Sequence, residues 1–128
     1  MGLLLDTHVF LWLADDSPQL SKAARDAIWE SDRIVLSVAS IWELGIKHSL
    51  KKLWTPDDDF GSLVQQSIEL CDVEILPVGL HHAIAANSLP LLHRDPFDRM
   101  LIAQSMTEGL ALVSQDTEIR RYDCTVVW

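Results

Sequence analysis

Short apolar runs alternate along this chain with longer stretches in which apolar residues recur every three or four positions. The short runs predict strands buried in a sheet, and the longer spacing predicts amphipathic helices. The expected strands cover residues 2–6, 33–37, 73–77, 110–114 and 125–128. The expected helices cover residues 7–15, 21–29, 40–48, 60–71, 79–88 and 96–108, followed by a helical turn over 117–122.

The helix at 96–108 has the clearest boundaries. Asp95 followed by Pro96 predicts an N-cap carboxylate and then a proline that needs no N–H donor at the first helical position. Gly109 follows the last apolar turn and is a favoured C-cap residue. This helix is therefore expected to have a fixed start, which matters because acidic residues gather there.

Strands that alternate with helices predict an α/β fold in which right-handed crossovers cover a sheet on both faces. The 128 residues contain no internal repeat and no linker, so we expect a single domain over 1–128. In such sheets, ligands bind beyond the carboxyl ends of the strands, where the strand order reverses. A functional site is expected at that edge.

Four acidic residues lie at junctions that this fold would bring towards the same edge. Asp6 and Asp116 come just after expected strands. Glu43 lies in the first turn of the helix after the second strand, and Asp98 in the first turn of the helix before the fourth. If the first and fourth strands are neighbours, all four carboxylates face one edge. Asp95 is an additional candidate, one helical turn from Asp98.

Each acid taken alone is explained as well by helix capping. Ser40-Ile41-Trp42-Glu43 matches a capping box, and Asp95 and Asp98 suit the N-cap and N3 positions, which the helix dipole favours. Taken together they conflict, since two carboxylates about 4 Å apart repel by roughly 4 kcal/mol at an effective dielectric near 20. A divalent cation removes that conflict, and an all-oxygen donor set favours Mg²⁺ or Mn²⁺ over zinc.

The charge balance is acidic, with nineteen Asp and Glu against ten Lys and Arg and a formal net charge of −9. By itself this argues against nucleic-acid binding, which relies on Lys and Arg, and fits metal binding or a basic protein partner. Cys71 and Cys124 form no CxxC motif and are expected to be free thiols in a reducing cytoplasm. No apolar run approaches the roughly 20 residues that span a bilayer, and the first residues do not form a signal peptide.

Histidines and tryptophans give weaker signals. His81 and His82 are adjacent and are expected on different helix faces, so metal binding by them is not expected. His93 is expected beside the acidic site, in a supporting or surface position. The tryptophans are expected in the core, with Trp12 or Trp54 as interface candidates if exposed. The chain has no HExxH, GxSxG, GxGxxG or P-loop motif.

In this order and spacing, four segments resemble the PIN-domain ribonucleases, specifically the VapC-type toxins of type II toxin–antitoxin pairs. These segments are residues 4–8 (LLDTH), 37–43 (SVASIWE), 93–104 (HRDPFDRMLIAQ) and 112–116 (LVSQD). The resemblance covers essentially the whole chain. It implies a three-layer α/β/α domain with a central, mainly parallel five-stranded sheet in which the first and fourth strands are neighbours.

The resemblance also implies metal-dependent endonucleolytic cleavage of RNA, with Mg²⁺ or Mn²⁺ and an activated water leaving a 5′-phosphate and a 3′-hydroxyl. It assigns metal binding and catalysis to four acids, with a fifth as an extra candidate: Asp6, Glu43, Asp98, Asp116 and Asp95. Thr7 and Ser114 are expected to support the site by orienting a ligand or water, and Ser114 stands where the family often has threonine.

Local bases near the site are expected to bind RNA, although each is also explained as an ordinary solvated side chain. They are Lys47, Lys51, Lys52, Arg94 and Arg99, with Arg120 and Arg121 in a nearby segment. The resemblance further implies a small cognate antitoxin whose basic segment enters the acidic cleft, and a homodimer.

Three alternatives remain open at this point. The first is a PIN nuclease that matures RNA in housekeeping metabolism. The second is a receiver-like phospho-acceptor domain, which is disfavoured because Thr7 and His8 follow Asp6 and no lysine follows the last strand. The third is a non-catalytic interaction module, which is disfavoured because all four acids are present.

Overall fold

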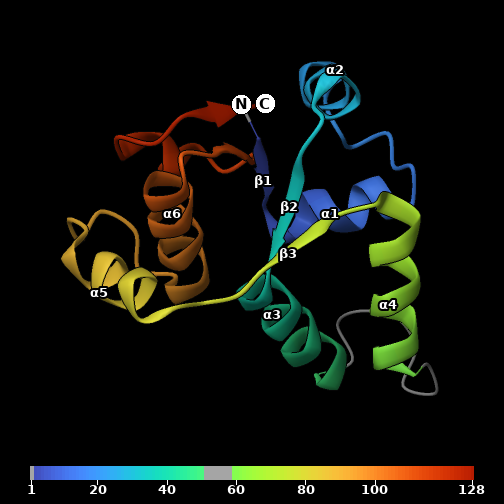
Figure 1. Cartoon of the computed structure of the whole chain (residues 1–128), viewed down its shortest axis with the longest axis horizontal. Helices are drawn as coiled ribbons and strands as arrows, with labels where there is room; N and C mark the ends of the chain where they lie inside the picture. Colours follow the sequence, from blue (N-terminus) through green and yellow to red (C-terminus); the bar gives the residue numbers. More distant parts are fainter. Residues whose placement is uncertain (1, 51–58) are drawn as a thin grey trace.

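A computed structural model of the chain describes residues 2–50 and 59–128. Its centre is one five-stranded sheet with the order β3-β2-β1-β4-β5, and every strand pairing is parallel (Figure 1). The strands are β1 (Leu3–Leu5), β2 (Ile34–Ser37), β3 (Glu74–Leu76), β4 (Ala111–Val113) and β5 (Val126–Val127). The predicted α/β architecture and the pairing of the first and fourth strands are confirmed.

The helices cover the two faces of this sheet (Figure 1). They are α1 (Thr7–Ala14), α2 (Lys22–Glu30), α3 (Val38–Ser49), α4 (Phe60–Cys71), α5 (Leu80–Ser88) and α6 (Pro96–Glu108), with a 3₁₀ helix η1 (Thr117–Arg121). On one side lie α1, α2 and α4, and on the other α6 packs on the sheet with α5 against it. The three layers match the expected fold.

Alternation along β1 divides the apolar interior between the two faces. Leu3 and Leu5 belong to the cluster under α1, α2 and α4, whereas Leu4 belongs to the cluster under α6. Leu4 and Leu5 are completely buried. The centre of the sheet is thus covered on both sides, which explains why β1 and β4 are continuous apolar runs.

The strand order reverses between β1 and β4. From β1 the chain moves outwards through β2 and β3, and it then returns to build β4 and β5 on the other side. Because all strands are parallel, their carboxyl ends share one edge of the sheet. The structure therefore has the reversal point at which ligands bind in folds of this kind.

The caps of α6 are as predicted. The Asp95 carboxylate accepts hydrogen bonds from the N–H groups of Phe97, at 2.9 Å, and of Asp98, at 3.4 Å. Gly109 ends the helix in the left-handed region, with φ of 66°, where glycine is favoured.

The predicted capping box at Ser40 is wrong. The N-cap of α3 is Ser37, the last residue of β2, whose hydroxyl accepts a hydrogen bond from Ala39 N at 3.0 Å. Ser40 lies inside the first turn and is buried. The helix begins earlier than expected because the strand runs directly into it.

The prediction that the tryptophans fill the core is also partly wrong. The side chains of Trp29 and Trp42 are 90% and 67% exposed. Trp12 and Trp128 are partly buried and pack against the core, and Trp54 lies outside the described residues. Within the described residues, no helix is both long and apolar enough to cross a membrane.

Candidate active site

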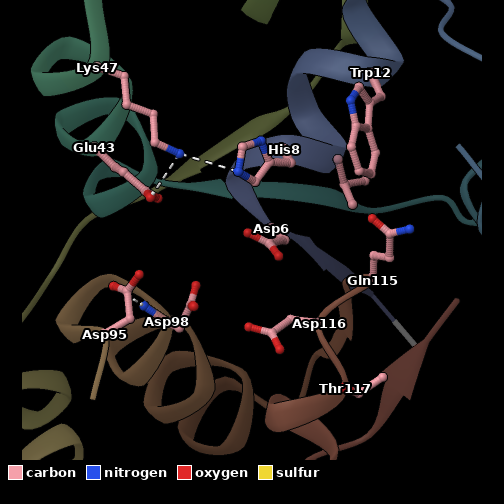
Figure 2. A pocket seen from close by; sticks show the side chains of 11 residues that line it. Asp6, His8, Trp12, Glu43, Lys47, Asp95, Asp98, Gln115, Asp116 and Thr117 are labelled. Atoms are coloured by element: carbon pink, nitrogen blue, oxygen red, sulfur yellow. Dashed lines mark hydrogen bonds and ion pairs between the residues drawn. The ribbon is translucent and has the colours of Figure 1, made fainter. Parts of the chain in front are cut away.

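Five carboxylates line one cavity of about 510 Å³ at the carboxyl edge of the sheet (Figure 2). Asp6 follows β1, Glu43 lies on α3, Asp95 and Asp98 open α6, and Asp116 follows β4. Four separate segments thus converge where β1 and β4 are neighbours, as the sequence predicts. The same cavity is bordered by Lys47 and by the aromatic side chains of His8 and Trp12, with Val9, Gln115 and Thr117 completing the lining.

Asp6 is the most deeply placed of these acids, with only 8% of its surface exposed. Burial raises the pKa of its carboxyl group, and a hydrogen bond from Ser114 opposes that shift. The Ser114 hydroxyl, itself fully buried, donates to Asp6 Oδ2 at 2.6 Å. The next residue, Thr7, is also buried, and its hydroxyl donates to Glu43 Oε1 at 2.6 Å. Thr7 and Ser114 therefore orient two carboxylates, and neither projects into the cavity as a free hydroxyl.

Asp98 carries the largest electrostatic strain. Burial, followed by the negative charges of Asp6 and Asp95, raises the pKa of Asp98 to about 7. The positive charge of His93 acts in the opposite direction without cancelling the shift. The carboxylates have therefore been brought close enough to disfavour one another's ionisation, which capping alone does not require.

His93 lies inside the site, closer than the sequence predicts. Its Nε2 atom is 3.0 Å from Asp98 Oδ2 and 3.0 Å from Asp116 Oδ2. Burial disfavours the charged imidazole, but the hydrogen bond to Asp116 and the charge of Asp98 outweigh this and raise the pKa of His93. The signal in the sequence was its position just ahead of the helix that begins with Asp95-Pro96.

Lys47 provides a cation on the side of the cavity opposite Asp98 and Asp116 (Figure 2). Its Nζ atom lies 3.3 Å from Glu43 Oε2 and 3.3 Å from His8 Nε2. The lysine is partly buried, with 28% of its side chain exposed. Of the bases expected to bind RNA that the structure describes, Lys47 is the one that borders the acidic cavity itself.

Arg99, one of the bases expected to bind RNA, is engaged in hydrogen bonds within the protein. Its guanidinium donates to the carbonyl oxygens of Ala86 at 2.9 Å and Pro90 at 3.0 Å, with longer bonds to Leu89 and His93. It therefore ties the segment after α5 to α6, and its donors face the protein instead of the cavity.

The remaining predicted bases differ in position. Arg94 is exposed and borders a shallow hollow next to the cavity, together with Glu43 and Lys47. Arg120 is exposed, and Arg121 pairs with Glu118 at 2.7 Å. Lys51 and Lys52 lie outside the described residues.

The donor set of the cavity fits a hard divalent cation. Its lining residues include five carboxylates, against one lysine. Carboxylate oxygens are the ligands that Mg²⁺ and Mn²⁺ prefer, and the raised pKa of Asp98 shows the charge conflict that such an ion would relieve. Asp6, Glu43, Asp98 and Asp116 are the residues available to hold it.

A second cluster, formed by His81, His82 and Glu108, does not fit a metal. Contrary to the expectation of opposite faces, the two imidazoles lie 3.9 Å apart and both approach Glu108. However, Gly79 N donates to His82 Nδ1 at 2.9 Å, so in the neutral ring the proton sits on Nε2. The nitrogen that faces Glu108 is thus occupied by hydrogen.

A sequence model of the PIN domain matches residues 3–123 of the chain. The chain belongs to the PIN-domain family. It is 28% identical over 123 residues to Ribonuclease VapC22 of Mycobacterium tuberculosis, covering 94% of this chain and 91% of that protein. The resemblance read from the four sequence segments is confirmed.

Solved structures share the fold of this PIN domain over nearly its full length. DNA-bound VapBC from Salmonella typhimurium matches with a TM-score of 0.70 and 18% identity, covering 98% of this chain and 96% of that chain. VapBC2 from Rickettsia felis, bound to a DNA fragment from its promoter, matches with a TM-score of 0.69 and 14% identity, covering 98% and 97%. At these identities the likeness concerns the fold.

Replacing Arg99 with methionine is expected to lower the free energy of unfolding by about 2–3 kcal/mol, because several carbonyl acceptors lose a charged donor. Urea denaturation measures the difference. Arg94→Met is the matched control, since the exposed Arg94 should tolerate the change within about 0.5 kcal/mol. Equal stabilities of the two variants would contradict the anchoring role of Arg99.

Asp98→Asn is expected to stabilise the metal-free protein, because it removes one of the charges that repel each other. Since the folded-state pKa of Asp98 lies above its unfolded value, the wild type loses stability as pH rises from about 4 through about 7. The gain from asparagine should therefore be largest near about pH 8 and small near about pH 5.

Thermal unfolding in EDTA at both pH values measures this gain, with Asp123→Asn, at an exposed acid, as the control. Added Mg²⁺ or Mn²⁺ should raise the melting temperature of the wild type and have much less effect on Asp98→Asn. A destabilised Asp98→Asn protein in EDTA would show that the carboxylate is structurally required.

Proposed function

We propose that this PIN-domain protein is a VapC-type endoribonuclease that hydrolyses RNA phosphodiester bonds with Mg²⁺ or Mn²⁺. The observation that carries the proposal is the convergence of Asp6, Glu43, Asp98 and Asp116 on one cavity, where burial and the neighbouring negative charges raise the pKa of Asp98 to about 7. The relative with 28% identity, Ribonuclease VapC22, supports this assignment.

The four acids are the residues that would hold the ion, with Asp95 beside them as the N-cap of α6. When bound, the ion would polarise a phosphate oxygen and supply a water nucleophile at neutral pH. Ser114 and Thr7 keep the Asp6 and Glu43 carboxylates in place through hydrogen bonds of 2.6 Å. We assign the orientation of the attacking water to Asp98 or Asp116, the latter with 33% of its side chain exposed.

The test is cleavage of single-stranded RNA by the purified protein, free of any partner, in Mg²⁺ or Mn²⁺. Activity should disappear in EDTA. Asp6→Asn should lower it by more than the about 10-fold to 100-fold typical of residues that only support metal ligands. Asp123→Asn, an exposed acid away from the cavity, should cleave like the wild type. Cleavage that persists in EDTA, or no cleavage of any RNA, would contradict the proposal.

The acidic cavity also suits a basic peptide. We propose that a small antitoxin neutralises this protein by inserting a basic segment among the carboxylates. Two of the structural neighbours are VapBC complexes, in agreement with such a partner. A housekeeping nuclease is the alternative, and expression in cells separates the two. A toxin should arrest growth, and co-expression of a neighbouring gene that encodes a small protein with a basic segment should relieve the arrest.

A cytoplasmic location follows from the proposed RNA substrate. The two cysteines are unpaired and partly buried, as expected for a reducing compartment.

An apolar groove of about 620 Å³ lies between α3 and the start of α6, next to the active-site cavity. Trp42 is 67% exposed there and meets Phe97 edge to face, with ring centroids 5.3 Å apart. None of the lining residues is charged: they are Val38, Ala39, Trp42, Ile46, Val78, Pro96, Phe97 and Met100.

We propose that a second copy of the chain covers this groove. A basic antitoxin segment would be attracted to the carboxylates of the neighbouring active-site cavity. An uncharged face, in contrast, lets two chains of net charge −9 meet without close repulsion between charged side chains. Trp42 lines the groove and projects from it, so each copy offers both a pocket and a side chain to fill it.

Trp42→Glu is therefore expected to convert a dimer into a monomer, because each interface would bury an unpaired charge. Light scattering after size exclusion should show twice the 14.4 kDa chain mass for the wild type and a single chain mass for the variant. Trp29→Glu, at a tryptophan that is 90% exposed on α2, should remain dimeric. A monomeric wild type, or equal effects of both variants, would contradict this interface.

A further inference from the structure

Three aromatic rings form a row at the rim of the acidic cavity. The His8 ring is stacked on Trp12, with centroids 5.9 Å apart and planes inclined by 27°. The Trp12 indole meets Trp128 at 5.7 Å with a tilt of 50°. Trp12 and Trp128 pack against the apolar core, whereas His8 is exposed. The row is therefore anchored at one end and open to solvent at the other.

The open end of the row borders the proposed catalytic residues. His8 and Trp12 are four residues apart on α1, so their side chains share one face of that helix, and both line the cavity. In Figure 2 the two rings project from α1 on the same side of the cavity as Asp6, opposite Asp98 and Asp116. His8 Nε2 also lies 3.3 Å from Lys47 Nζ, which places a cation beside the exposed ring.

We propose that His8 and Trp12 form a stacking platform for an unpaired base of the RNA substrate, next to the phosphate that is cleaved. This inference rests on the proposed ribonuclease function. The substrate class is single-stranded RNA, because a base in a duplex is already stacked on its neighbours and cannot reach the ring.

The charge of the site explains why such a platform is needed. Among the described residues, five carboxylates and a single lysine or arginine, Lys47, line the cavity, so attraction of RNA phosphates is weak. Stacking on an aromatic side chain does not depend on charge and contributes about 5-fold to 150-fold in affinity per base. It tolerates every base, since each has a π-face.

The exposed position of His8 separates this role from packing. Trp12 fills space in the core and would be retained for that reason alone, but His8 has its outer surface in solvent. Because its ring is stacked on Trp12 and exposed to solvent, a base could continue the stack or replace the imidazole on Trp12. Lys47, 3.3 Å from His8 Nε2, would then lie beside the same nucleotide.

The first experiment measures steady-state cleavage of a short unstructured RNA by the wild type, His8→Ala, His8→Phe and His81→Ala. His8→Ala should raise KM by at least about 5-fold, the lower end of a stacking contribution, with kcat nearly unchanged. His8→Phe should restore the wild-type KM because it retains a ring. His81→Ala is the matched control, at an exposed histidine on α5 that does not line this cavity.

A substrate with one abasic nucleotide beside the cleavage site gives the decisive comparison. The wild type should bind the abasic RNA as weakly as His8→Ala binds the intact RNA. His8→Ala should bind the abasic RNA no more weakly than it binds the intact RNA. If the two losses add independently, or if His8→Ala has the KM of the wild type, no base stacks on this ring and the inference is overturned.

Binding without cleavage separates this inference from the proposed function. Fluorescence anisotropy of a labelled oligonucleotide, with Ca²⁺ in place of Mg²⁺ and the oligonucleotide checked for integrity, reports affinity alone. Ring-dependent binding by a protein that cuts no RNA would support the platform and refute the ribonuclease. Cleavage that is indifferent to His8 would refute the platform and leave the ribonuclease intact. Absence of any binding would overturn both.

Discussion

Mutual repulsion among the carboxylates at the end of β1 and β4 is the constraint on which the rest of the site depends. The protein offsets it with contacts of two kinds. The hydroxyl groups of Ser114 and Thr7 donate to Asp6 and Glu43. The basic side chains of His93 and Lys47 lie 3.0 Å from Asp98 and 3.3 Å from Glu43. These contacts are incomplete, since the pKa of Asp98 stays near 7. The residual strain is what a divalent ion would relieve, in competition with His93 for the same oxygens.

The sheet provides the rigidity that holds these charges together. In the pairing of β1 with β4, Leu5 lies opposite Val113, so the next residues, Asp6 and Ser114, are also abreast. Asp6 N donates to Val113 O at 3.0 Å, which continues the ladder up to the acid itself. Both strands are buried on both faces, and a shift of register would move every side chain to the wrong face. The hydrogen bond between Ser114 and Asp6 is thus a consequence of strand register.

The sequence was sufficient for the elements and for the convergence of the acids on one edge of the sheet, because short apolar runs, an Asp-Pro start and a glycine stop are strong local signals. The sequence was insufficient where two residues, or two environments of one residue, fit the local pattern equally well. Ser37 and Ser40 both resemble N-caps, and only the end of β2 decides between them. Arg99 looks like a free base beside an acid until the carbonyl groups after α5 are placed around it. Trp42 fits an apolar helix face, but periodicity does not tell a core from an interface.

The net charge of −9 is the global quantity that fits the proposed RNA substrate least well. Exposed charges act over roughly 8 Å at physiological ionic strength, so acids on distant helices contribute little at the cavity. An RNA bound as proposed would meet local groups: five carboxylates, the cations beside them and the aromatic row of His8 and Trp12. A divalent ion held by the acids would offset part of their negative charge beside the phosphate, and stacking needs no charge at all. The acidity of the whole chain is therefore compatible with the proposed action on RNA.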